Sequence, residues 1–248
     1  MRTIDLNSDL GEGAGTDEVL IPLITSANVA CGAHAGDERT MRETVALALK
    51  HGVAVGAHPG YRDPKNFGRL ALDIPDEALR EDLRLQIETL RRIAGEVGAR
   101  VTHVKAHGAL YNQADRDERL ARAIAETVAS IDRSLVLFAM PRSAMEKVGK
   151  ELGLRVAREG FADRAYEKDG ALRSRTLPGA LNEDPAVASA QALSIARDGR
   201  VGTFGGGSLA LEVETICLHG DTPGAPEIAV AVREALAAAG VTLRPLRV

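Results

Sequence analysis

The sequence predicts an α/β fold, a seven-stranded parallel (β/α) barrel. Short apolar, β-branched segments alternate with longer amphipathic segments along the chain, as in parallel strands joined by right-handed helical crossovers. Polar side chains follow one apolar run after another, and a barrel brings many strand ends together on one face, whereas an open sheet offers a single crevice. No linker or composition break divides residues 1–248, so one barrel domain is expected.

Seven segments have the length and composition of strands. They are residues 2–9 (RTIDLNSD), 26–32 (SANVACG), 53–58 (VAVGAH), 100–107 (RVTHVKAH), 134–140 (SLVLFAM), 154–159 (LRVARE) and 214–220 (ETICLHG). The segment Val201–Val213 has three glycines near its centre and predicts an extra hairpin before the last strand.

Helical patterns lie between these strands. In DEALREDLRLQIETLRRIAGEV, apolar residues recur at steps of three and four, as they do on the buried face of a helix. The predicted helices are Glu38–Gly52, Asp76–Val97, Asp117–Ile131, Ser143–Leu152, Asp184–Arg197 and Pro226–Ala239.

Composition excludes several classes of function. The net charge is −4 with no basic cluster, and aromatic residues make up 3%, which argues against nucleic acid as a partner. No apolar run approaches the roughly 18 residues of a membrane span, and the first residues lack a secretory pattern. Two cysteines, Cys31 and Cys217, cannot build a disulfide framework and fit a reducing compartment. A cytoplasmic protein is expected.

Chemically active side chains gather at the predicted strand ends. These candidates are Asn7, Asp9, Glu12, His34, Asp37, His58, Tyr61, Asp63, Lys105, His107, Glu159, His219 and Asp221. In THVKAHGALYN, His103, Lys105 and His107 alternate, so on a strand they share one face, which is either a solvated surface or a catalytic pocket. Imidazoles, carboxylates and an ammonium are the groups that acid–base catalysis uses.

Several of these motifs have alternative interpretations. HAGD and HGD each place an imidazole near a carboxylate, either as an acid–base pair or with Asp37 and Asp221 capping the next helix. The loop YRDPKNFGR, which contains Arg69, is either an anion clamp or a solvated loop. Cys31 is more typical of core than of a nucleophile. A divalent metal is conceivable on Asp9, His34, His58 and His107, although their spacing matches no established metal motif.

Long motifs of this chain resemble the LamB/YcsF lactam-utilisation family. They run in order from Ile4 to past Asp221: DLNSDLGEG, SANVACGAHAGD, GVAVGAHPGYRD, NFGR, HVKAHGALYN, FADRAY and ICLHGD. The chain departs from the family's usual pattern at three positions. Ser8 stands where the family has cysteine, Leu70 where it has arginine and Ala106 where it has proline.

The resemblance implies a distorted, seven-stranded barrel related to glycoside hydrolases and polysaccharide deacetylases. It implies a role in 5-oxoprolinase as its A component, which opens 5-oxo-L-proline to L-glutamate with ATP as co-substrate and with subunits B and C as partners. From the positions at the strand ends and the chemistry of this reaction, the predicted catalytic residues are Asp9, Glu12, His34, His58, Lys105, His107 and Asp221. The predicted substrate-binding residues are Asn7, Asn28, Tyr61, Arg69, Tyr111 and His219. Lys105 and His107 are then expected to face the barrel mouth, with His103 one layer deeper.

Two other functions stay open on the sequence. One is a metal-dependent deacetylase or amidohydrolase that needs no ATP, and the other is a non-catalytic subunit that binds the lactam for its partners. The chain carries neither a Walker motif nor a GxGxxG fingerprint. We therefore expect ATP-coupled turnover to require the partner subunits.

Overall fold

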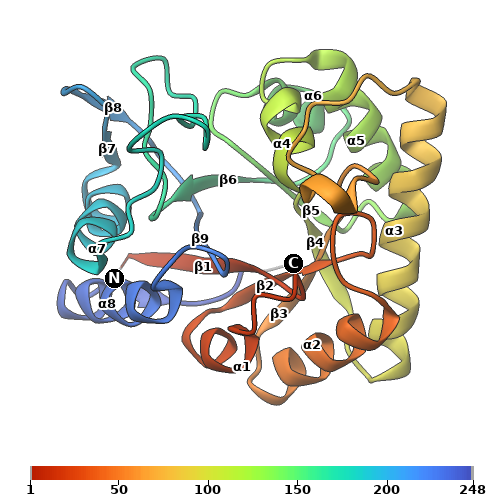
Figure 1. Cartoon of the computed structure of the whole chain (residues 1–248), viewed down its shortest axis with the longest axis horizontal. Helices are drawn as coiled ribbons and strands as arrows, with labels where there is room; N and C mark the ends of the chain where they lie inside the picture. The colour runs from red at the N-terminus through yellow and green to blue at the C-terminus, as the bar shows by residue number, and fades with distance from the viewer. Residues whose placement is uncertain (1, 247–248) are drawn as a thin grey trace.

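Seven parallel strands close into a barrel in the computed structural model, which describes residues 2–246 (Figure 1). The barrel strands are β1 Thr3–Leu10, β2 Ser26–Ala30, β3 Ala54–His58, β4 Val101–Val104, β5 Val136–Ala139, β6 Val156–Phe161 and β9 Thr215–His219. Consecutive strands pair from β1 to β6, and β9 closes the ring by pairing with both β6 and β1. The predicted seven-stranded fold is confirmed.

The barrel is distorted where β3, β4 and β5 meet. The register between β3 and β4 shifts at Val55/Gly56, and only His103 and Val104 of β4 pair with β5. Gly56 explains part of this geometry, because a Cβ at that position would lie 2.1 Å from Nε2 of His103. The imidazole therefore occupies the space that a side chain at position 56 would need, and it lies buried inside the barrel.

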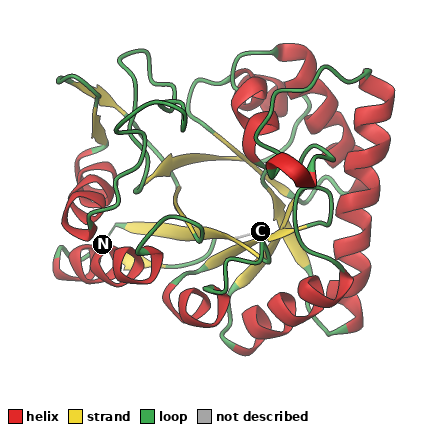
Figure 2. Cartoon of the chain, viewed as in Figure 1, coloured by secondary structure: helices red, strands yellow, loops and turns green. Residues whose placement is uncertain are grey.

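Helices surround most of the barrel, while loops cross it near β6 (Figure 2). The helices are α1 Asp17–Leu20, α2 Glu38–Lys50, α3 Asp76–Glu96, α4 Gly108–Ala114, α5 Glu118–Ile131, α6 Ala144–Glu151, α7 Pro185–Leu193 and α8 Ala225–Ala238. Four of them start at an Asp or Ser whose side chain accepts a backbone N–H of the first turn, which satisfies donors left free there. Among residues 2–246, no helix is both long enough and apolar enough to cross a membrane.

The six predicted helices are all present, and the sequence missed two short ones, α1 and α4. The fourth strand also ends earlier than predicted, at Val104, and the chain continues in extended form because the Lys105 and His107 N–H groups donate to the Ala57 and Pro59 carbonyls. The predicted hairpin is confirmed as the antiparallel pair β7 Arg200–Gly202 and β8 Ser208–Ala210. A short strand, β10 Thr242–Leu243, pairs with the start of β1.

Candidate active site

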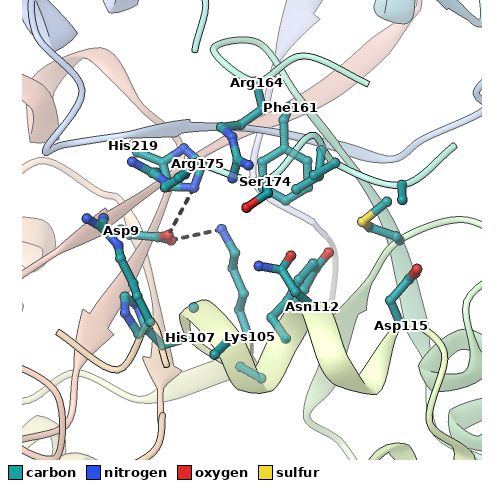
Figure 3. Close-up of a pocket in the computed structure, with 18 of the residues that line it drawn as sticks. Asp9, Lys105, His107, Asn112, Asp115, Phe161, Arg164, Ser174, Arg175 and His219 are labelled. Atoms are coloured by element: carbon teal, nitrogen blue, oxygen red, sulfur yellow. Dashed lines mark hydrogen bonds and ion pairs between the residues drawn. The ribbon is translucent and has the colours of Figure 1, made fainter. Parts of the chain in front are cut away.

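A cavity of about 460 Å³ opens where the carboxyl ends of the strands meet (Figure 3). Asp9, His58, Lys105, His107 and His219 line it, as predicted from their positions after apolar runs. We call these five side chains the cavity floor. The helix α4, which follows directly on β4, adds Tyr111, and the loop after β6 contributes Arg164, Ser174 and Arg175.

Lys105 lies at the centre of the floor and is held by two carboxylates. Its Nζ lies 2.9 Å from Oδ1 of Asp9, 3.1 Å from Oε1 of Glu159 and 3.0 Å from Sγ of Cys217. Burial by itself would lower the pKa of Lys105, but the neighbouring Asp9, Cys217 and Glu159 hold this pKa well above its usual range. Lys105 is therefore a charged ammonium in a site shielded from water, where its electrostatic effect is strong.

A layer of amides and a histidine supports this floor from inside the barrel. Asn28 Nδ2 donates to Oδ1 of Asp9 at 2.8 Å and to Oδ1 of Asn7 at 2.7 Å. His103 Nε2 lies 2.9 Å from Oδ1 of Asn28, and Asn7 Nδ2 donates to Glu159 at 3.0 Å. Asn7 and Asn28 are fully buried and do not line the cavity, so they orient the floor carboxylates and lie out of reach of a substrate.

His219 forms a dyad with Asp163, a residue that the sequence interpretation missed. Its Nδ1 lies 3.0 Å from both Asp163 oxygens, while its Nε2 faces the cavity 3.9 Å from Oδ2 of Asp9. Burial alone would raise the pKa of Asp163, but the His219 ring and the hydrogen bonds donated by the His219 N–H and Thr222 hold it well below its usual range. An ionised Asp163 fixes the proton on Nδ1 and leaves Nε2 free to accept a proton.

A second cluster, which we call the histidine centre, consists of Glu12, His34, His58 and His107. Oε1 of Glu12 lies 3.0 Å from Nε2 of His34, 3.2 Å from Nδ1 of His107 and 3.7 Å from Nε2 of His58. The rings of His34 and His107 stack with centroids 3.6 Å apart. Burial lowers the pKa of His34 to about 4, so this ring is neutral near pH 7. The sequence suggested Asp9 as the carboxylate ligand beside these three histidines, whereas the structure groups them with Glu12. Asp9 remains nearby, 3.3 Å from Nε2 of His58.

Arginines form the opposite side of the cavity, and Figure 3 shows Arg164 and Arg175 across from Lys105. Arg69 pairs with Asp221, and Arg175 Nη1 lies 3.7 Å from the same carboxylate. Arg164 is buried and donates only to the backbone carbonyls of Ala180 and Arg173 among the described residues. Burial, followed by the nearby Arg175, lowers the pKa of Arg164 to about 10. We call Arg69, Arg164 and Arg175 the arginine wall.

The acid–base pair is the wrong interpretation for both HAGD and HGD, and the alternative of a helix cap is confirmed for Asp37 but is wrong for Asp221. His219 pairs with Asp163 while Asp221 bridges arginines, and His34 pairs with Glu12 while Asp37 caps α2. In both cases the carboxylate partner comes from the end of a different strand. Barrel closure brings the ends of separate strands together, so these residues lie closer than the carboxylate in the same turn. Asp221 therefore lies beside the wall and does not line the cavity.

The two tyrosines lie in different places. Tyr111 lines the cavity and donates its hydroxyl to Oε2 of Glu159 at 2.7 Å. Tyr61 is buried outside the cavity lining, and its hydroxyl donates to Gln113 at 2.8 Å, so it has no route to a substrate in this cavity. Cys31 is a buried thiol whose pKa burial raises to about 12, which agrees with a core residue.

Sequence reasoning missed three residues around the cavity, of which two had a usable signal, because Asp163 and Arg164 lie in the motif FADRAY. Glu159 is among the polar residues expected at the strand ends, and the structure adds its contact with Lys105. Arg175 lies in a loop with no pattern that marks it.

A pH-dependent loss of stability is expected from His103. Burial, with a further contribution from Lys105, lowers its pKa from 6.5 to about 3, so the folded state binds fewer protons than the unfolded state between these values. Its contribution to stability is therefore complete above pH 6.5 and is lost as the pH falls. Between pH 6.5 and 4.5 the loss is roughly 2–3 kcal/mol. Urea unfolding of the wild type and of His103→Gln over this range should give a steeper decline for the wild type, and parallel curves would contradict the assignment.

The chain is similar to known proteins in both sequence and structure. Residues 4–248 match the model of the LamB/YcsF family. The chain is 48% identical over 251 residues to the A component of 5-oxoprolinase from Rhodopseudomonas palustris, covering 99% of this chain and 98% of the relative. It superimposes on the crystal structure of a lactam utilization protein from Thermus thermophilus with a TM-score of 0.92 at 43% identity, covering 98% of this chain and 100% of that chain.

A more distant likeness concerns the fold alone. The peptidoglycan deacetylase PdaC of Bacillus subtilis matches with a TM-score of 0.51 at 15% identity, covering 98% of this chain and 87% of that one. The predicted likeness to deacetylase barrels is thereby confirmed at the level of architecture.

Proposed function

Because the chain belongs to the LamB/YcsF family, we propose that it is the A component of an ATP-dependent 5-oxoprolinase. The reaction is the cleavage of 5-oxo-L-proline to L-glutamate, coupled to the conversion of ATP to ADP and phosphate. ATP is the co-substrate, and subunits B and C are the partners.

One observation carries this proposal: a single cavity joins an acid–base floor to an arginine wall. The His219–Asp163 dyad and Lys105 lie on one side, and Arg164 and Arg175 lie on the other. A substrate that presents an amide carbon to the floor and an anionic group to the wall matches both sides. 5-Oxoproline has a carboxylate, and its phosphorylated form has a phosphoryl group as well, so guanidinium groups suit either.

The chemistry explains why a lactamase of this kind uses ATP. An unstrained five-membered lactam keeps its amide resonance, so water opens it slowly. Transfer of the γ-phosphoryl group to the lactam oxygen makes the ring carbon electrophilic. Water then adds to that carbon, and the C–N bond breaks as the nitrogen gains a proton, which gives an acyl phosphate. A second water hydrolyses this acyl phosphate to glutamate and free phosphate.

The chain's own residues match the steps after phosphorylation. Nε2 of His219 can take a proton from the attacking water, because Asp163 holds the other ring proton at Nδ1. The Lys105 ammonium stabilises negative charge that develops at the former lactam oxygen. Arg164 donates only to backbone carbonyls and forms no ion pair among the described residues, so its positive charge is available for the anionic group.

Reconstitution with the partner subunits tests the function. We expect glutamate release from 5-oxoproline only when this chain, subunits B and C, and ATP are all present, with one ADP formed per glutamate. In the same assay, Arg164→Gln should raise KM for 5-oxoproline by about tenfold or more, because it removes a charge-assisted hydrogen bond of roughly 1.5–3 kcal/mol. Turnover that does not depend on this chain would contradict the proposal.

A second candidate function is ATP-independent amide hydrolysis with a metal ion, as in the alternative drawn from the sequence. The histidine centre favours it, because Glu12 and three imidazoles offer ligand atoms within 4.8 Å of one another. Glutamate formation by the isolated, metal-loaded chain without ATP would select this candidate over the ATP-dependent one.

A further inference from the structure

The histidine centre contains a contact that neutral imidazoles alone do not explain. His58 Nε2 and His107 Nδ1 face each other at 3.0 Å. The other nitrogen of each ring lies 2.8 Å from a backbone carbonyl, Lys105 O for His58 and Phe67 O for His107. Carbonyl oxygens only accept hydrogen bonds, so both outer nitrogens carry a proton. In the neutral rings, the two facing nitrogens therefore both present lone pairs, and a positive charge is needed between them.

This arrangement of outer hydrogen bonds is the one found around metal-bound histidines. A histidine that binds a metal through one ring nitrogen almost always donates its other N–H to a carbonyl, a carboxylate or water, which fixes the tautomer and the ring orientation. Both His58 and His107 meet this condition through main-chain atoms, which do not depend on side-chain rotamers.

The spacing of the inner atoms points the same way. Glu12 Oε1 lies 3.0–3.7 Å from the inner nitrogens of His34, His58 and His107. A tetrahedral zinc ion with bonds of about 2.0–2.2 Å holds its ligand atoms about 3.3–3.6 Å apart. The facing nitrogens of His58 and His107 lie 3.0 Å apart, and all four ligand atoms lie within 4.8 Å of one another, so one ion can bring them together.

The buried charges around the histidine centre favour a divalent cation. Asp9, Glu12 and Glu159 bring three formal negative charges to this buried region, and Lys105 brings one positive charge. Buried charges that lack partners are costly. A divalent ion beside Glu12 would offset more of this negative charge than one proton shared between the imidazoles.

We propose that Glu12, His34, His58 and His107 bind a divalent transition-metal ion, with Zn²⁺ as the best match. Three nitrogen ligands and one carboxylate oxygen suit zinc, while calcium and magnesium prefer sites made of oxygen atoms. His58 and His107 also line the cavity, so the ion lies at the floor, next to Asp9. This inference does not depend on the proposed function.

Metal loading tests the proposal without any measurement of turnover. The folded chain, stripped with a chelator and then exposed separately to Zn²⁺ and Co²⁺, should retain about one ion per chain after gel filtration. The Co²⁺ form should show visible absorption typical of tetrahedral coordination. His34→Gln and Glu12→Gln should weaken zinc binding by about a hundredfold or more. The effect should be this large because each variant removes a ligand itself, whereas loss of a hydrogen bond to a ligand typically weakens metal binding by about 10- to 100-fold.

The matched control is His103→Gln, which replaces an equally buried histidine outside the centre and should load like the wild type. Substoichiometric loading of the wild type, or equal loading of His34→Gln and His103→Gln, would overturn the proposal and leave a shared proton as the positive charge. Should a ligand variant fail to fold, the stoichiometry and Co²⁺ spectrum of the wild type decide alone. An inactive but fully loaded chain would speak against the proposed function and not against the metal site.

Discussion

Replacement of His219 by glutamine is expected to lower turnover of the reconstituted enzyme by about a hundredfold to ten-thousandfold, the usual range for loss of a general base. The physical reason is that Asp163 holds the ring proton of His219 on Nδ1, which leaves the unprotonated Nε2 facing the cavity. Glutamine keeps a polar side chain of similar reach but cannot accept a proton at neutral pH. The measurement is kcat for glutamate release at saturating ATP, together with a check of folding by circular dichroism.

Asp163→Asn extends this test to the positioning residue. The carboxylate accepts hydrogen bonds from the His219 ring, the His219 N–H and Thr222, and an amide cannot accept all of them and also enforce the Nδ1–H tautomer. We expect a fall in kcat with little change in KM, and a tautomer change visible in the ¹⁵N spectrum of His219.

His51→Gln is the matched control, since His51 lies at the end of α2 outside the cavity, and its activity should stay within about twofold of wild type. Wild-type kcat in His219→Gln would instead favour a non-catalytic, lactam-binding subunit.

The barrel could be predicted from sequence because its signals are local. Apolar runs of four to eight residues and helices with a repeat near 3.6 leave a pattern that does not depend on tertiary contacts. The position of each polar residue after its run also predicted which side chains meet, and Asp9, His58, Lys105 and His107 do line one cavity. His103 lies one layer deeper, as expected from its alternation with Lys105.

Pairing within the site could not be predicted, because it depends on which strands become neighbours. β9 follows β6 around the barrel, which brings His219 to Asp163 and leaves Asp221 to the arginines. Likewise, Asn7 and Asn28 have the residue type of substrate ligands, yet their register places them inside the barrel. The sequence also gives no sign that Glu159 would share Lys105 with Asp9, since 150 residues separate the two carboxylates along the chain.

Because Lys105 lies between two carboxylates, we expect Lys105→Met to lose both folding stability and turnover. Methionine fills a similar volume but leaves Asp9 and Glu159 buried without their shared cation. Removal of one partner from a buried ion pair typically costs about 3–5 kcal/mol of folding free energy. Turnover should fall by about a hundredfold or more in the molecules that stay folded, because the charge that stabilises the developing oxyanion is gone. Urea unfolding and kcat of the reconstituted enzyme measure the two effects separately.

A double variant separates charge balance from catalysis. Adding Glu159→Gln to Lys105→Met removes one of the two stranded carboxylates, so it should recover part of the lost stability without restoring turnover. Lys50→Met, which alters an exposed lysine in the last turn of α2, controls for loss of a lysine and should change neither quantity measurably. If Lys105→Met retained wild-type turnover, Lys105 would act only as a counter-ion that holds Asp9 and Glu159 in place, and the charge for the oxyanion would have to come from the arginine wall.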